Sequence, residues 1–557
     1  MLAKFRIIFI LLGLFVLYAG LGVRLFHIQI NCHAKYSEMA KDNYSVHISR
    51  VSPYRGEICD RNGVQLAINK HTYSVGFNYK YGAHTEEMKK AVLGSLKVDI
   101  SKFEDSNDFV WYVRHVDPQD ISGILEYRKD GLVIVKENSR YYPKAPMAAQ
   151  VIGCVGTDNQ GLSGIEYNFD DQLKDKVADC EFLRDAKGRI VNLSSRDDSS
   201  EDSVSKIYLT IDANLQYIAE RELMSGFKKY KPKWGLAIIQ NPSNGHILAM
   251  AQYPSFDNNS LVVSDVEALK NMSVSNIFEP GSTFKIVTAA AAIEEKLIKT
   301  DEIIDCENGE YEVGGFPIRD FKPYEKLTFE NCMVHSSNIA LAKVGARLGR
   351  RLLYKYARDF GFGNFTGIRL PGEPRGILRK PDRWSGTSVS RIAFGQEIGV
   401  TALQLVGAFS VIANGGLLYE PRIIDRIVIN DKSREFESIM IRRVVSAQTA
   451  ETITGMMKKV VEEGSGMQAA VEGYKVAGKT GTAQKYNPDT QTYKEDKYIA
   501  LFGGFVPAET PELTIIVAFD EPETELYWGG YVAAPVFSAI ARAALNYMNI
   551  PPSGVTE

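Results

Sequence analysis

Ser282 and Lys285 are three residues apart and could form a nucleophile and its base. They belong to the segment 279–285 (EPGSTFK), which continues into an apolar, alanine-rich run. The pattern predicts a buried helix that begins at the serine and carries both side chains on one face. Burial lowers the pKa of a lysine, and a neutral amine can deprotonate a serine. S-x-x-K is a short motif, so a capping serine with a solvated lysine is the alternative.

Ser336 and Asn338 form a second polar pair, directly before a helical stretch expected at 339–348. A hydroxyl and an amide could project on the same side of the turn that starts this helix. Both residue types also favour helix starts for structural reasons, so ordinary capping is an alternative interpretation.

A third motif, Lys479-Thr480-Gly481-Thr482, follows an apolar stretch at 474–477 that is predicted to be a strand. Gly481 would let a ligand or another backbone approach closely. Lys479 would add a second cation, which helps to keep Lys285 neutral and attracts a carboxylate. Residues 473–480 also match the phosphate-binding pattern G-x-x-x-x-G-K-[ST]. No helix is predicted after Thr480, so a nucleotide site is not expected.

The strands and helices that must position these motifs follow a simple order along the chain. Strand patterns lie at both ends of a helix-rich middle, at 207–211, 234–240, 247–251, 474–477, 500–506 and 513–519. This order predicts one α/β domain at 205–550 with an antiparallel sheet. Residues 31–200 alternate short strands with turns and read as a separate mixed α+β domain, joined by a small polar linker at 199–205.

The N-terminus predicts the compartment. Residues 7–23 carry no charge, Lys4 and Arg6 precede them, and Arg24 follows. We expect residues 1–30 to form a cytoplasmic tip and one transmembrane anchor, with the rest exported. A cleaved signal peptide is the alternative. The six cysteines would then lie where disulfides persist, and the sequence decides neither their pairing nor whether they stay thiols.

Composition excludes several classes. Hydrophobic residues make up 45% and charged residues 24%, which is typical of folded chains. The net charge of −3 argues against a nucleic-acid binder. Histidines and cysteines are too dispersed for a metal cluster.

The ordered triple S-x-x-K, S-x-N and K-T-G resembles the serine penicillin-recognising enzymes, the penicillin-binding proteins and β-lactamases. Further segments resemble the class B penicillin-binding proteins, those without a glycosyltransferase domain. They are 55–63 (RGEICDRNG), 140–143, 161–166, 362–363, 370–373, 413–416 and 533–537. Residues 185–190 and the C-terminus resemble the cell-division subgroup. Asn241, Asn244 and Glu397 depart from the family, which commonly has Asp, Thr and Gly there.

The resemblance implies a pedestal (dimerisation-type) domain and a peptidoglycan D,D-transpeptidase domain. It implies that Ser282 attacks the penultimate D-Ala of a donor stem peptide and that Lys285 accepts its proton. The backbone N–H groups of Ser282 and Thr482 would hold the oxyanion. Ser336 would relay a proton and Asn338 would hold the substrate amide. The terminal carboxylate would bind at the third motif, which comprises Lys479, Thr480, Gly481 and Thr482. No metal or organic cofactor would be needed.

The expected partners are donor and acceptor stem peptides, β-lactams, a membrane glycosyltransferase and division-complex proteins. The expected site is the cytoplasmic (inner) membrane, with the N-terminus inside and the catalytic domain outside. An elongation-type transpeptidase, a D,D-carboxypeptidase, a β-lactamase and a non-catalytic division scaffold are the alternatives. The sequence does not decide the acceptor amine or the oligomeric state.

Overall fold

The computed structural model describes residues 2–48, 54–79, 84–103, 109–174, 180–184, 190–194, 205–260, 266–487 and 492–552. The chain forms two compact units. The N-terminal unit comprises 1–54, 70–139 and 175–201, and the C-terminal unit comprises 55–69, 140–174 and 202–557. Most of the predicted linker and most of the segment 185–190 lie outside the described residues.

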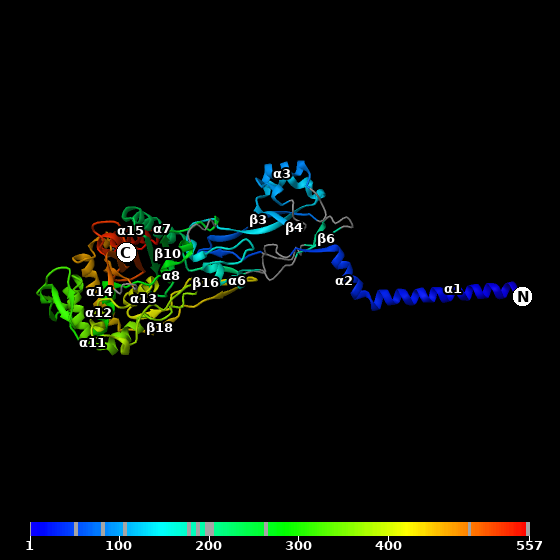
Figure 1. Ribbon diagram of the computed structural model, residues 1–557. Coiled ribbons are helices and arrows are strands. Elements are labelled where there is room, and N and C mark those ends of the chain that lie inside the picture. The colour runs from blue at the N-terminus through cyan, green and yellow to red at the C-terminus, as the bar shows by residue number, and fades with distance from the viewer. Residues whose placement is uncertain are drawn as a thin grey trace. The chain divides into compact units, whose positions relative to one another are not determined.

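The N-terminal unit starts with helix α1 (Leu2–Phe26), which continues through a π-helical turn, η1 (His27–Asn31) (Figure 1). The segment Lys4–Asn31 contains an 18-residue stretch with a mean hydropathy of 2.3, and it is long and apolar enough to cross a membrane. It is the one such helix in the part of the chain that the structure describes. Helix α2 (His33–Tyr44) follows.

Two sheets make up the rest of this unit. Strands β1 (Ser45–Ile48), β6 (Cys180–Arg184) and β7 (Ile190–Ser194) form an antiparallel sheet. The second contains the distal part of β3 (Gln65–Asn78), which pairs with β4 (Phe109–Val116) and β5 (Leu132–Tyr141). Three short helices pack around a small core that includes Phe77, Met88 and Ile134: α3 (Glu86–Leu96), η2 (Ile100–Phe103) and η3 (Pro118–Asp130).

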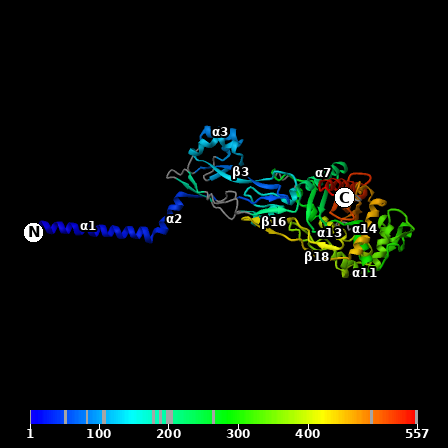
Figure 2. The ribbon, with the colours of Figure 1, turned by 180° about the vertical axis from the view of Figure 1, so that it is seen from behind.

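An antiparallel five-stranded sheet organises the C-terminal unit, in the order β10–β9–β21–β20–β19. The strands are β9 (Trp234–Gln240), β10 (Ile247–Tyr253), β19 (Ala477–Asn487), β20 (Thr492–Val506) and β21 (Leu513–Asp520). Helices α7 (Ala213–Tyr230) and α15 (Gly529–Tyr547) cover one face. The helices between residues 272 and 462 lie on the opposite side, as both views show (Figure 1, Figure 2).

The helices on that opposite side supply most of the larger core. They are α8 (Met272–Ser275), α9 (Lys285–Glu294), α10 (Phe329–Val334), α11 (Asn338–Asp359), α12 (Ser388–Ala393), α13 (Ala402–Ala413) and α14 (Ala447–Glu462). Short strands join them: β11 (Ile303–Asp305), β12 (Glu310–Val313), β13 (Phe316–Arg319), β14 (Lys326–Thr328), β15 (Leu417–Tyr419) and β18 (Met440–Arg443). Helix α9 is buried along its apolar run, as its sequence predicts.

The remaining strands of the C-terminal unit are β2 (Ile58–Cys59), β8 (Lys206–Leu209), β16 (Ile424–Ile429) and β17 (Lys432–Glu435). Strand β2 pairs with β8 in parallel and with the start of β3, while β16 pairs with β8 and β17. Three short helices, α4 (Ala149–Ile152), α5 (Gly164–Asn168) and α6 (Asp170–Leu173), pack beside them.

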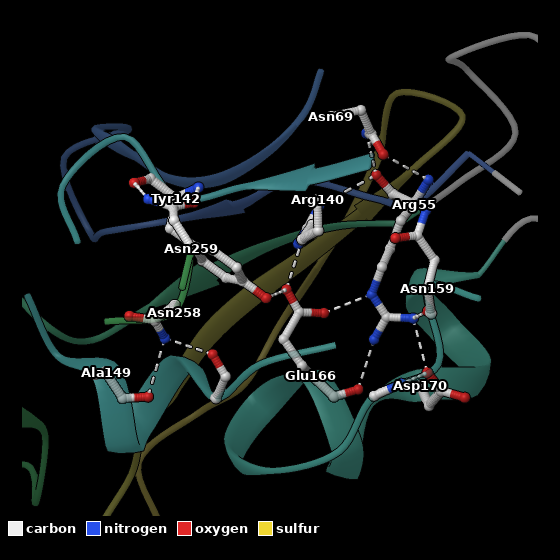
Figure 3. A network of polar contacts seen from close by, with 12 residues as sticks. Arg55, Asn69, Arg140, Tyr142, Ala149, Asn159, Glu166, Asp170, Asn258 and Asn259 are labelled. Atoms are coloured by element: carbon white, nitrogen blue, oxygen red, sulfur yellow. Dashed lines mark hydrogen bonds and ion pairs between the residues drawn. The ribbon is translucent and has the colours of Figure 1, made fainter. Parts of the chain in front are cut away.

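A buried ionic network joins three of the sequence segments that resemble the family (Figure 3). Arg55 donates to Glu166 Oε2 at 2.5 Å and to Asp170 Oδ1 at 2.7 Å, and Arg140 donates to Glu166 Oε1 at 2.6 Å. The Arg55 and Glu166 side chains are fully buried, so each compensates the charge of the other. The segments 55–63, 140–143 and 161–166 are therefore distant in sequence but adjacent in the fold.

The fold predicted from the sequence is confirmed, with an N-terminal apolar helix, a mixed region and an antiparallel α/β sheet domain. One strand prediction is wrong. Residues 474–476 are not in a strand, and β19 starts at Ala477 and contains Lys479 and Thr480. The apolar residue Val476 is buried because it packs with the α7 and α15 side of the sheet. A strand also follows Thr480, so the structure bears no phosphate-binding loop at 473–480.

Candidate active site

Ser282 lies in a single 3-10 turn, η6 (Gly281–Phe284), that leads into α9. The predicted helix start is therefore correct, although its first turn is tighter than an α-helix. Gly281 has φ +53°, and its N–H donates to Gly395 O at 3.0 Å. Ser282 is partly exposed, whereas Phe284 and Lys285 are buried. The serine hydroxyl thus lies at the surface end of a helix whose body is in the core.

Lys285 is fully buried and its amine lies among polar atoms of the second motif. Nζ donates to Ser336 O at 2.6 Å and to Asn338 Oδ1 at 2.7 Å, and it lies 3.2 Å from Ser336 Oγ. Burial lowers the pKa of Lys285 to about 7, although the negative charge of Asp320 opposes this shift. A substantial fraction of Lys285 is therefore neutral near neutral pH.

Ser336 adopts a left-handed backbone conformation, with φ +59°. This conformation is unfavourable for a non-glycine residue and persists where the surroundings impose it. Asp320 holds the next residues, because it accepts from Ser337 Oγ and Asn338 N, each at 2.5 Å, and from Ile339 N at 3.1 Å. The carboxylate thereby caps the start of α11 and fixes the turn that presents Ser336.

Lys479 approaches the same serine from β19. Its Nζ donates to Ser336 Oγ at 2.9 Å, and the side chain is fully buried. Burial and then the charge of Lys285 lower the pKa of Lys479 well below its usual value. Two ammonium groups around one hydroxyl repel each other, so the pair favours a state with fewer than two charges.

Thr480 and Thr482 extend the site along β19. Ser465 Oγ lies 2.7 Å from Thr480 Oγ1, and Thr482 Oγ1 accepts from Gly529 N at 3.1 Å. Gly481, between the two threonines, allows close packing. A Cβ there would lie 2.9 Å from Thr283 Cγ2 and 3.1 Å from Pro280 O. Strand β19 therefore runs directly against the turn that carries Ser282.

The structure brings three of the predicted side chains, Lys285, Ser336 and Asn338, into one hydrogen-bonded cluster that Lys479 joins. Ser282 is next to this cluster through η6, but within the described residues no hydrogen bond joins its Oγ to Lys285. The arrangement combines a partly exposed hydroxyl, a buried amine of low pKa and a relay hydroxyl. Such a set can support nucleophilic acyl transfer.

Sequence reasoning missed three residues that shape the site. Asp320 is far from every motif in sequence, and no pattern around it indicates its contact with the start of α11. Ser465 is likewise found only through its contact with Thr480. Glu279 lies three residues before Ser282, and burial raises its pKa to about 7, with a smaller contribution from the charge of Glu397.

The cysteines whose side chains the structure describes are thiols: Cys32, Cys59, Cys154, Cys306 and Cys332. Cys306 and Cys332 flank the second motif, because Ser337 Oγ lies 3.7 Å from Cys306 Sγ and Ser337 N donates to Cys332 O at 2.9 Å. Within the described ranges, no group of three or more His, Cys, Asp or Glu side chains could hold a metal ion.

Comparisons with known proteins identify the class. Residues 235–542 match the penicillin-binding protein transpeptidase domain, and residues 50–204 match the penicillin-binding protein dimerisation domain. Stage V sporulation protein D of Bacillus subtilis is 35% identical over 98% of this chain and 86% of that protein. Peptidoglycan D,D-transpeptidase FtsI of Escherichia coli is 30% identical over 92% of this chain and 87% of its own length.

A solved structure agrees. Penicillin-binding protein 3 of Mycobacterium tuberculosis, in complex with aztreonam, has a TM-score of 0.70 and 29% identity, and the match covers 90% of this chain and 98% of that one. The chain therefore belongs to the class B penicillin-binding proteins. The resemblance inferred from the motifs is confirmed.

Proposed function

We propose that the protein is a peptidoglycan D,D-transpeptidase in which Ser282 forms an acyl-enzyme with a donor stem peptide. The observation that carries the proposal is the cluster in which Lys285 and Lys479 both donate to Ser336 beside the Ser282 turn. The family matches and the relatives' names support the reaction class. The serine mechanism rests on the geometry of this chain.

In this proposal the two lysines have different roles: Lys479 binds the substrate's carboxylate and Lys285 accepts the serine proton. When the donor's terminal carboxylate binds at Lys479, Thr480 and Thr482, its negative charge favours the protonated form of Lys479. Repulsion from that ammonium then favours the neutral form of Lys285, the form that can accept the Ser282 proton. Substrate binding thus places the charge on the binding lysine and leaves the base free.

The leaving D-Ala needs a proton, and Ser336 supplies a path. Its Oγ is within 3.2 Å of Lys285 Nζ and 2.9 Å of Lys479 Nζ, so a proton can pass through the hydroxyl to the departing amine. The backbone N–H groups of Ser282 and Thr482 would hold the developing oxyanion, a contribution of about 3 kcal/mol per donor in other enzymes. Asn338 would bind the donor's amide. An amine of a second stem peptide then resolves the acyl-enzyme.

Hydrolysis by water is the competing outcome, as in a carboxypeptidase or a β-lactamase. Some β-lactamases use a glutamate between the second and third motifs as the base that activates water. Glu373 is the residue of this chain whose sequence position comes closest to that glutamate. In the structure it accepts from Thr366 N at 2.6 Å and from Thr366 Oγ1 at 2.5 Å. Because these bonds tie its carboxylate to its own loop, we assign Glu373 a structural role and favour aminolysis.

The cellular setting follows from the same proposal. The N-terminal helix would anchor the chain once in the cytoplasmic membrane, with Lys4 and Arg6 inside and the catalytic domain outside. Residues 31–200 would form the pedestal and 205–550 the transpeptidase domain. We propose a septal role, with a membrane glycosyltransferase and division-complex proteins as partners. An elongation-type role would instead place the tagged protein along the side wall of growing cells.

Covalent labelling by a fluorescent penicillin tests the nucleophile. Ser282→Ala should lose the label completely. Ser275→Ala is the matched control, because Ser275 Oγ donates to the carbonyl of Asn271, the residue before α8, and Ser275 is outside the motifs. Full labelling of Ser282→Ala would overturn the assignment.

A further inference from the structure

Two buried thiols lie beside the second motif, one just after β11 and one within α10. They belong to Cys306 and Cys332, and both side chains are fully buried. The two thiols hydrogen-bond to each other. We call them the thiol pair. None of the roles assigned above uses it, although two thiols in direct contact need only an oxidant to become a covalent link.

The segment between the two cysteines, 307–331, helps to position the second motif. It carries Asp320, whose carboxylate holds the start of α11. Ile318 is the one buried residue between 307 and 328, a stretch that the structure describes throughout, and β12 and β13 form a two-stranded sheet of their own. A segment with so little buried surface opens locally at a small cost in free energy. The two ends of the segment are therefore important for holding Asp320 in place.

Both cysteines also contact the second motif directly, through Ser337. Cys332 O accepts from Ser337 N at 2.9 Å, and Cys306 Sγ lies 3.7 Å from Ser337 Oγ. Ser337 lies between the two motif residues Ser336 and Asn338. A covalent link between the cysteines would therefore close the segment that carries Asp320 at the point where the segment meets the motif.

The thiol pair is also polarised for thiol–disulfide exchange, in which the thiolate is the attacking form. The hydrogen bond from Cys332 lowers the pKa of Cys306 below its usual value, although burial opposes this shift. The same hydrogen bond, and then burial, raise the pKa of Cys332. Elsewhere in the C-terminal unit, burial raises the pKa of Cys59 to about 11 and also raises that of Cys154. Cys306 thus differs from these two buried cysteines in being able to start an exchange.

We propose that Cys306 and Cys332 form a reversible disulfide that closes the segment 307–331 and braces the second motif. The oxidant is an external disulfide, either a small molecule such as oxidised glutathione or the disulfide of a thiol oxidase. Local opening of the segment gives it access to the buried pair. The proposal holds for any reaction at Ser282, and the exported location proposed above is one in which disulfides persist.

The exchange takes two steps. The Cys306 thiolate attacks one sulfur of the external disulfide, whose S–S bond breaks and releases one thiol, and a mixed disulfide remains on Cys306. The Cys332 thiol then loses its proton and attacks Cys306 Sγ, which breaks the mixed disulfide and releases the second thiol. Two protein thiols are thereby oxidised to one disulfide, and the external disulfide is reduced to two thiols.

Peptide mapping tests the link in the detergent-solubilised full-length protein. The protein is equilibrated with oxidised and reduced glutathione at several ratios, denatured in excess N-ethylmaleimide and digested without reduction. We expect the peptides of Cys306 and Cys332 to be joined in oxidised glutathione and separately alkylated in reduced glutathione. Cys59 and Cys154 are the matched buried controls and should be alkylated throughout. Alkylation of the thiol pair at every ratio, a different pairing, or stable glutathione adducts on the pair would overturn the proposal.

The bracing role is tested by heating the oxidised and the reduced protein and then measuring labelling of Ser282 by a fluorescent penicillin. The link restrains the unfolded segment, so the temperature at which half of the labelling is lost should be at least about 3 °C higher in the oxidised protein. Cys332→Ala should abolish this difference, and Cys154→Ala should keep it. Equal midpoints in the two forms of the unaltered protein, or the same difference in Cys332→Ala, would show that the link does not brace the motif. Mapping and heating of the unaltered protein decide the proposal even if a substitution prevents folding.

Discussion

At the scale of single residues, the main feature of the site is the protonation state of two buried amines, those of Lys285 and Lys479. Lys285 and Lys479 have no acidic side chain within hydrogen-bond range among the described residues, and both donate to Ser336 instead. Burial therefore dominates their electrostatics and lowers the pKa of each. The proposed mechanism requires one of the two amines to be neutral and the other charged, and in that mechanism the substrate's carboxylate supplies the asymmetry.

The acylation rate should depend on pH through Lys285, whose pKa is about 7. In the proposed mechanism the neutral amine is the base, so the rate of penicillin acylation should rise about tenfold per pH unit below 7 and level off above it. Stopped-flow or quenched labelling between pH 5 and 9 measures this. A rate that falls as pH rises through 7 would contradict the role of a neutral Lys285.

Asp320→Asn should lower the acylation rate by about 10–100-fold, because Asp320 accepts three hydrogen bonds at the start of α11 and thereby holds Ser336 and Asn338. It should also move the midpoint of the pH profile below that of the unaltered protein. The negative charge of Asp320 raises the pKa of Lys285, and the substitution removes that charge.

Asp301→Asn is the matched control for Asp320→Asn, since Asp301 is an exposed residue in a turn. Its pH profile should coincide with that of the unaltered protein. If Asp320→Asn has the same maximal acylation rate and the same pH midpoint as the unaltered protein, Asp320 does not position the site.

At the scale of elements, the site is an intersection of one strand and two helix starts. Strand β19 carries the third motif, η6 and α9 carry the first, and the start of α11 carries the second. The contact between β19 and η6 requires a glycine at 481, because Thr283 and Pro280 leave no room for a Cβ. The spacing of the elements is therefore set by backbone approach as well as by side chains.

Gly481→Ala should lower the penicillin acylation rate by at least about tenfold, because the added methyl group would push β19 away from the Ser282 turn. Gly455→Ala is the control. Gly455 lies inside α14 with no atom within 4 Å of a built Cβ, so this change should stabilise the helix by about 0.5–1 kcal/mol and leave acylation intact. Equal acylation rates in the two variants would contradict the close-approach argument.

Much of the local structure around the motifs could be predicted, because residue spacing within a short motif indicates the local backbone conformation. The S-x-x-K spacing and the apolar run after Lys285 predicted a buried helix at the serine. The conformation of Ser336 and the role of Asp320 could not be predicted, since both depend on contacts between segments far apart in sequence. Val476 misled the strand assignment, because a buried apolar residue outside a strand has the same sequence signal as one inside it.

At the scale of the whole molecule, the C-terminal unit includes segments that precede the transpeptidase match. Residues 55–69 and 140–174 belong to this unit, and the network of Arg55, Arg140 and Glu166 holds them together (Figure 3). Asp60 extends the connection, because its Oδ2 accepts from Ala213 N at 3.0 Å at the start of α7. The signature 55–63 thus contributes to the stability of the unit that contains the site.

Arg55→Ala should destabilise the protein by about 3–5 kcal/mol, since it leaves Glu166 buried with one cationic partner fewer. Arg442→Ala removes an exposed pair with Asp359 and should cost no more than about 1 kcal/mol. Thermal or urea unfolding of the two variants measures both values. If Arg55→Ala lowers the free energy of unfolding as little as Arg442→Ala does, the buried network is not required for stability.

The central claim is that Ser282 forms a long-lived acyl-enzyme that awaits an amine, and intact-mass measurement tests it most directly. Full-length protein in detergent is labelled with benzylpenicillin, chased with a different β-lactam and sampled over time, with peptide mapping of the adduct. We predict one penicilloyl group on Ser282 that persists for many minutes, and none in Ser282→Ala. An adduct on another residue, or loss of the adduct within seconds together with catalytic turnover of penicillin, would contradict the account.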